Sequence, residues 1–215
     1  NNSTNSGSYT KLTYQFINEN RDYIEYPLNG YYLYFEGSKY VEGESPINHF
    51  EIIGQAEKHL ELKNRFFLGT SFKAKWASKG YQPYFFQEGF GFEDYVRGYE
   101  YYVVDGQKFW LSKTVLKYAL IKKTNFEIPY VKMKQFNKAH YSLYLGFFSD
   151  MGYIIDNQTN QNNTLSNQLL FGKGISLDYV TYYDKILRIE FSMNHLGEKG
   201  VFLHFSNPFG SKQKL

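Results

Sequence analysis

The chain has 215 residues, of which 22 are Tyr, 20 are Phe and none is Cys. Its 24 basic and 21 acidic residues leave a formal net charge of +3, too small to indicate a nucleic-acid partner. The lack of Cys excludes disulfide scaffolds, thiolate metal sites and Cys nucleophiles, and no apolar run reaches the ~18 residues of a membrane-spanning helix. The mean hydropathy of -0.53 fits a soluble β-rich protein, but it equally fits a membrane β-barrel, in which polar and apolar residues alternate.

Four strands are predicted in the first third of the chain, over Tyr9–Phe16, Gly30–Gly37, Phe50–Leu62 and Phe66–Ala77. The fourth has the clearest period of two. One face carries Phe66, Leu68, Thr70, Phe72, Ala74 and Trp76, and the other carries Phe67, Gly69, Ser71, Lys73 and Lys75. This pattern is typical of a sheet with one face against oil or a core.

A long segment without periodicity follows, from Ser78 to Gln107, rich in Gly and aromatic residues. Loops of this length are usually functional or disordered, and the aromatic content argues against disorder. Asp156–Gln168 is a second, polar segment that we expect to form a surface loop. The remaining strands are predicted over Phe109–Ile121, Tyr130–Phe136, His140–Ile155, Ile175–Tyr183, Ile186–Asn194 and Val201–Phe205.

These elements predict an all-β, antiparallel, up-and-down fold of roughly eight to ten strands, joined mostly by hairpins. The predicted strands do not alternate with helices, so the sequence disfavours a parallel α/β sheet. Strands near ten residues and an excess of aromatic residues favour a transmembrane β-barrel, which carries aromatic girdles at both membrane interfaces. The alternative is a soluble β-sandwich with an aromatic core.

Two short motifs make the prediction more specific. Val96-Arg97-Gly98-Tyr99 lies within the long loop, and Phe148-Ser149-Asp150-Met151-Gly152 lies on the second predicted strand after it. Together, in this order, they resemble the signatures of the BamA-like superfamily, which includes outer-membrane assembly factors, TamA-like proteins and two-partner-secretion transporters. The resemblance implies that the 78–107 loop folds back into a barrel and that Arg97 meets Asp150 on the inner wall.

The carboxyl end carries a third likeness to the family. Its last strand contains Gly200, Val201, Phe202, Leu203 and Phe205 and approaches the aromatic Phe209. Such a strand resembles an outer-membrane targeting signal. In the family, the first and last strands meet at a seam that opens to offer an unpaired edge to an incoming strand. The tail 210–215 departs from the family pattern.

The motifs cover about Phe66 to Phe209, and the earlier strands match by pattern only. The chain therefore resembles the last eight to nine strands of a larger, sixteen-stranded barrel. We expect residues 1–215 to be a fragment, a processed product or one half of a split protein. The implied partners are a nascent outer-membrane protein or secreted polypeptide, outer-membrane lipids, the missing amino-terminal barrel half, and periplasmic or lipoprotein subunits.

Elementary electrostatics gives the motif pair a physical role. A guanidinium can leave water only when paired, and a bidentate pair with a carboxylate is geometrically stiff. Arg97 and Asp150 would then form a latch that holds the loop against the wall, with Gly98 allowing a tight turn beside it. The alternative is that Arg97 is a solvated loop cation and Asp150 an ordinary strand residue.

No catalytic or cofactor site is predicted. The five His residues have no ligand-like spacing, so no metal site is expected, and no Ser lies in a nucleophile elbow. The sequence thus predicts a non-enzymatic protein of the outer membrane that assists protein insertion or polypeptide translocation. Two alternatives remain: a small, self-contained structural or adhesive barrel, and a soluble glycan-binding sandwich.

Overall fold

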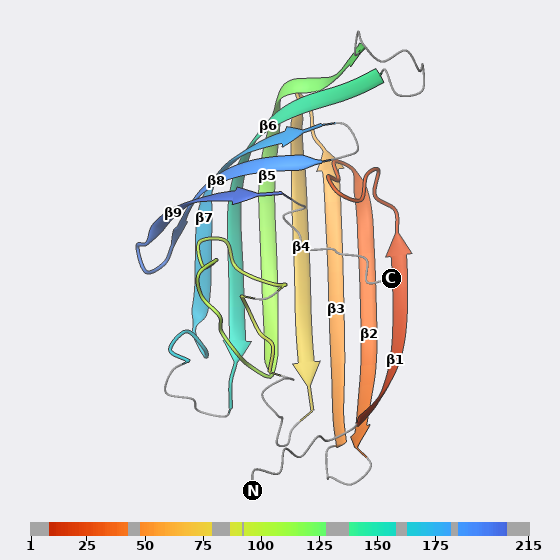
Figure 1. The fold of residues 1–215 in the computed structure, drawn as a ribbon, viewed down its shortest axis with the longest axis vertical. Helices are drawn as coiled ribbons and strands as arrows, with labels where there is room; N and C mark the ends of the chain where they lie inside the picture. The colour runs from red at the N-terminus through yellow and green to blue at the C-terminus, as the bar shows by residue number, and fades with distance from the viewer. Residues whose placement is uncertain are drawn as a thin grey trace, which may run out of the picture.

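In the computed structural model, the chain forms one antiparallel sheet of nine strands in the order β1-β2-β3-β4-β5-β6-β7-β8-β9 (Figure 1). The structure describes residues 9–42, 48–78, 87–91, 93–127, 138–157, 163–181 and 185–205. Each strand pairs with its neighbour in the sequence, so the predicted all-β, up-and-down topology is confirmed. The strands are β1 Tyr9–Glu19, β2 Gly30–Glu42, β3 Asn48–Glu61, β4 Phe66–Ala77, β5 Lys108–Glu127, β6 Lys138–Ile155, β7 Leu169–Val180, β8 Ile186–Asn194 and β9 Lys199–His204.

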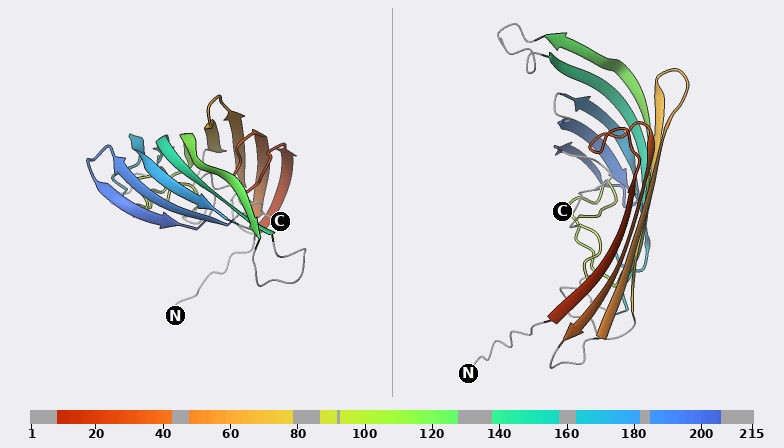
Figure 2. Two further views of the ribbon diagram at one scale, coloured as in Figure 1. Left: turned by 90° about the horizontal axis from the view of Figure 1, so that it is seen from above. Right: turned by 90° about the vertical axis from the view of Figure 1, so that its right-hand side faces the viewer.

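The sheet is open in the part of the chain that the structure describes. β1 pairs only with β2 and β9 pairs only with β8, so these two strands are the edges. The sheet is strongly curved, and the views from above and from the side both show it bending around a concave face (Figure 2). The closed barrel that the sequence predicts therefore stays a prediction, because the described strands form an open sheet.

The strand lengths agree with the alternating sequence pattern. β2, β3 and β4 have 13, 14 and 12 residues, slightly more than the ~9–11 that a tilted strand needs to cross a bilayer. β5 and β6 have 20 and 18 residues and extend well beyond their neighbours (Figure 1). Their register shifts between Ala119 and Thr124, which marks a β-bulge where the long pair bends.

The two faces of the sheet differ in polarity. Outward positions carry large exposed apolar side chains, while many of the inward positions carry buried charged side chains. The outward residues include Leu12, Phe35, Phe72, Phe147, Ile175, Phe191 and Leu203. The buried polar residues of the concave face include Glu36, Glu57, Lys75, Lys113, Asp150, Asp178, Arg188 and Glu190.

All described strands overlap the predicted ranges, but most boundaries differ, and β1, β2 and β5 extend well beyond the residues predicted for them. Phe66–Ala77 and Ile186–Asn194 are reproduced residue for residue. The strand predicted over Ile175–Tyr183 begins at Leu169, because the residues before Ile175 continue the pairing with β6 despite two glycines. β9 also begins earlier than predicted, at Lys199, and ends at His204. The strand predicted over Tyr130–Phe136 lies outside the described residues.

Candidate functional site

The connection between β4 and β5 lies against the concave face of the sheet (Figure 2). Its described residues are 87–91 and 93–107. An isolated antiparallel bridge between Phe90 and Val104 brings the two arms of this loop together. The Phe90 N–H donates to the Val104 carbonyl at 2.9 Å, and the Val104 N–H donates to the Phe90 carbonyl at 2.8 Å. At the tip, Tyr99 N–H donates to the Val96 carbonyl at 3.0 Å and closes a tight turn. The Val96-Arg97-Gly98-Tyr99 motif is therefore the turned tip of this loop.

Apolar packing fixes the loop to the sheet beneath it. A single cluster joins loop residues to inward residues of β5, β6 and β7, and Val96 is fully buried in it. Leu165, from the polar segment predicted over Asp156–Gln168, also packs here; the middle of that segment lies outside the described residues. The cluster consists of Phe90, Val96, Tyr99, Val104, Phe109, Leu111, Ile154, Leu165 and Leu170.

Arg97 and Asp150, the two motif residues, form a bidentate ion pair. Arg97 Nε donates to Asp150 Oδ2 at 2.7 Å, and Nη2 donates to Oδ1 at 2.6 Å. The side chains are 1% and 0% exposed, and the guanidinium lies 3.8 Å from the centroid of the Phe148 ring. Short paired donors of this kind fix both distance and orientation. Arg97 is thus a buried, oriented cation and not a solvated one.

Glycines allow the loop to approach the sheet this closely. A Cβ on Gly172 would lie 1.8 Å from the Arg97 carbonyl oxygen, and one on Gly152 would lie 2.5 Å from the Phe90 ring. Gly98 has φ +94°, a conformation that L side chains rarely adopt. The glycine of the Phe148–Gly152 motif therefore provides space for the loop.

A second buried pair lies beside the first and escaped the sequence reasoning. Arg188 on β8 donates from Nε and Nη2 to the Asp178 carboxylate on β7, both at 2.6 Å. Tyr26, from the β1–β2 connection, donates to Asp178 at 2.8 Å. Asp178 and Arg188 are register partners across a hairpin. The alternation of the two predicted strands places both side chains on the inward face, and this was the signal that could have revealed the pair.

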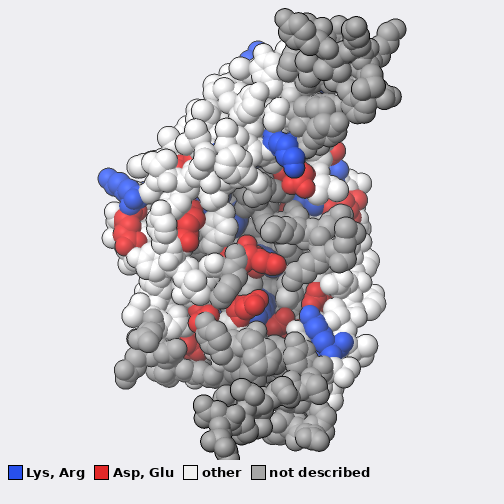
Figure 3. All heavy atoms as spheres, in the orientation of Figure 1, with Lys and Arg blue, Asp and Glu red and all other residues white. Residues whose placement is uncertain are grey.

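Glu190 lies between the two pairs. One of its oxygens is 3.9 Å from Arg97 Nε and the other 3.8 Å from Arg188 Nε. Figure 3 shows acidic and basic side chains lying among one another on the face seen in the orientation of Figure 1. The concave face thus carries a connected set of charges that ties the loop to β6, β7 and β8.

The predicted closing strand has the expected alternation. Val201, Leu203 and Phe205 are exposed on the outward side, at 69%, 57% and 73%. Gly200 and Phe202 lie on the opposite face of the strand and are partly buried. Phe209, the proposed terminal aromatic, lies outside the described residues.

No helix in the described part of the chain is long and apolar enough to cross a membrane. Comparison of the chain with protein-family models, with curated proteins and with solved structures finds no match.

Proposed function

We propose that the chain is the carboxyl-terminal part of an outer-membrane β-barrel that resembles the BamA-like superfamily and assists protein insertion or polypeptide translocation. The observation that carries the proposal is the buried Arg97–Asp150 pair, which joins two motifs 53 residues apart in the sequence. A bidentate contact between these two residues is the arrangement that the resemblance implies, and it therefore supports the proposal.

The distribution of polarity supports the membrane part of the proposal. A soluble β-sandwich buries its apolar face against a second sheet, whereas here the apolar side chains of a single sheet are the exposed ones. An outer-membrane barrel has apolar side chains facing the lipid and polar or charged side chains facing its lumen. The open edges at β1 and β9 are where the other barrel half would pair.

The edge at β9 supports the assembly part. Unpaired backbone N–H and C=O groups along an edge strand can take up an incoming strand by β-augmentation. β9 is short, with six residues, and its described residues pair only with β8. A short edge strand is easier to separate than a long one, so this side of the sheet is the better candidate for a seam that opens.

Site-specific crosslinking tests this function. The chain has no Cys, so one introduced Cys is unique. Val201→Cys places a photo-crosslinker on β9, and Phe72→Cys places the same group on the outward face of β4, in the middle of the sheet. During synthesis of outer-membrane proteins, we expect client adducts at position 201 to exceed those at position 72 several-fold. Equal labelling at the two positions would contradict the proposal.

A further inference from the structure

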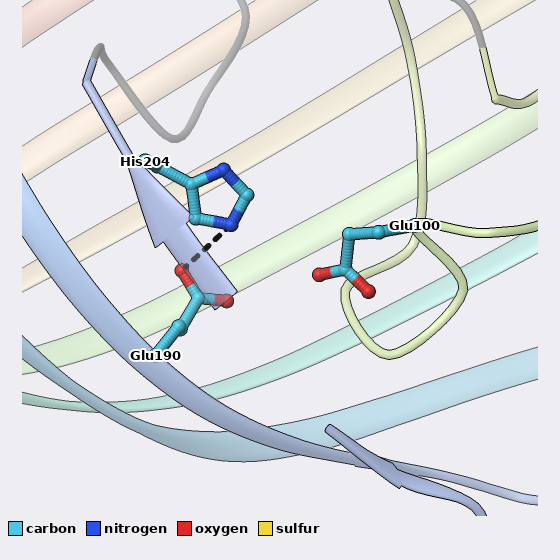
Figure 4. Close-up of side chains that lie close together, drawn as sticks. All are labelled: Glu100, Glu190 and His204. Carbon is cyan, nitrogen blue, oxygen red and sulfur yellow. Dashed lines mark ion pairs between the residues drawn. The ribbon is translucent and has the colours of Figure 1, made fainter. Parts of the chain in front are cut away.

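Three side chains from three separate elements converge on one point beside the latch. Glu100 comes from the loop, Glu190 from β8 and His204 from β9 (Figure 4). One ligand atom from each lies within 4.8 Å of the other two. Glu190 Oε2 and His204 Nε2 are 3.9 Å apart. These residues are 104 positions apart at most, so sequence spacing could not reveal the group.

Each of the three side chains has a buried polar atom without a hydrogen bond in the described part of the structure: Glu100 Oε1, Glu190 Oε1 and His204 Nε2. Glu190 is 1% exposed, so its carboxylate is shielded from bulk solvent. The other oxygen of Glu100 accepts the Gly98 N–H at 2.8 Å, which orients the carboxylate. Buried polar groups are rarely left unpaired, and here three of them point at the same space.

The two carboxylates of the group lie close together in a buried place, where a cation between them would relieve their repulsion. Burial, followed by the proximity of Glu190, raises the pKa of Glu100 to about 7, because two carboxylates are confined together. Arg97 and Arg188 already form bidentate pairs with aspartates, so neither donates a hydrogen bond to Glu190, which lies 3.9 and 3.8 Å from their Nε atoms.

We propose that Glu100, Glu190 and His204 form a binding site for a divalent transition-metal ion of the Zn²⁺ type. An imidazole with two carboxylates is a ligand set for such ions, whereas Ca²⁺ and Mg²⁺ prefer oxygen ligands alone. Zn–N and Zn–O bonds of about 2.0–2.2 Å place tetrahedral ligands roughly 3.4 Å apart. Small side-chain rotations close the observed separations to this value, and a water completes the coordination.

Such an ion would fasten the last strand to the loop. Its ligands would connect β9 and β8 to the residue three positions after Arg97, so that the latch and the closing strand become one unit. Metal binding itself rests on the geometry, burial and charge of the three side chains and does not depend on the proposed function. The consequence for opening of a seam rests on the proposed function.

Competition with a chromogenic chelator measures the site on the purified full chain, folded in detergent. We expect one Zn²⁺ per chain, with an affinity that falls in acid, because the ligands bind the ion only when they have lost their protons. Glu100→Gln and His204→Asn should each weaken binding at least about tenfold, since even the outer partners of metal ligands contribute about 10–100-fold. Millimolar Ca²⁺ should not displace the ion. His140→Asn, which alters a histidine on β6 outside the group, should leave the affinity unchanged.

Two outcomes would overturn the site. One is the absence of saturable binding, which would mean that the two glutamates share a proton instead. The other is an equal loss of affinity in His140→Asn and His204→Asn, which would indicate non-specific surface binding. The visible spectrum of Co²⁺ in the same protein separates a lost ligand from a misfolded variant. Absence of client crosslinks at position 201 with the zinc affinity intact would count against the proposed function alone.

Discussion

Asp150→Asn is expected to lower the free energy of unfolding by about 3 kcal/mol. The substitution removes the charge that neutralises Arg97 but leaves the guanidinium buried, and breaking a buried pair in this way costs about 3–5 kcal/mol. The lower end applies because Glu190 remains 3.9 Å from Arg97 Nε as a partial partner. The urea concentration at which the unboiled, folded band disappears from a gel measures the change.

Two further variants show whether the unpaired charge is the cause. Glu61→Gln neutralises an exposed carboxylate at the end of β3 and should leave the urea midpoint unchanged. Arg97→Met combined with Asp150→Leu removes both charges, and apolar replacement of a buried pair is often close to neutral. The double variant should therefore be more stable than Asp150→Asn. A midpoint for Asp150→Asn equal to that of the wild type would rule out the latch.

Gly172→Ala is expected to detach the loop from the sheet. The added methyl group would lie 1.8 Å from the Arg97 carbonyl oxygen, a backbone atom that can move only with the loop. Overpacking of this kind costs about 1–3 kcal/mol. Trypsin, which cleaves after Arg97, reports the displacement directly. We expect the cleavage rate at this site to rise about tenfold or more, because each ~1.4 kcal/mol of easier opening gives a factor of ten.

Gly54→Ala is the matched control for this experiment. Gly54 also lies within a strand, but a Cβ there has no atom within 4 Å. Alanine in place of a strand glycine should leave the protein equally or slightly more stable, because the unfolded chain loses freedom. Cleavage after Arg97 should then match that of the wild type. Equal protection of Arg97 in Gly172→Ala and Gly54→Ala would mean that the loop does not depend on close contact with β7.

Local sequence patterns predicted most of the sheet, because a strand with one apolar and one polar face has a sequence in which apolar and polar residues alternate. β4 and β8 are reproduced with their limits, since each alternates from end to end and stops at a turn. The start of β7 was missed because Gly172 and Gly174 interrupt the apolar pattern there. Those glycines face the loop and the neighbouring strand, so their reason is tertiary and not local.

The contacts of the candidate site depend on tertiary structure, as the start of β7 does. Arg97 and Asp150 could be paired from the sequence only through a family resemblance, because spacing alone does not bring residues 53 positions apart together. Tyr26 donates to Asp178 across 152 residues, a contact set by the curvature of the sheet. The Glu100, Glu190 and His204 group likewise depends on how the loop folds over β8 and β9. The alternation of apolar and polar residues predicts which face of a strand a side chain lies on. The curvature of the sheet and the path of the loop decide which of the inward side chains come into contact.

Quenching of the tryptophans by brominated lipids tests the central claim, that the outward face of this sheet contacts a bilayer. The chain has two Trp residues, Trp76 on β4 and Trp110 on β5. Trp76 is 46% exposed on the outward face, and Trp110 stacks on the outward Phe72. In vesicles of phosphatidylcholine with brominated acyl chains, the account predicts strong quenching of the folded protein and little effect of iodide in the water. Quenching by iodide but not by the lipid would contradict it, because the apolar face would then lie in solvent or in a protein interface.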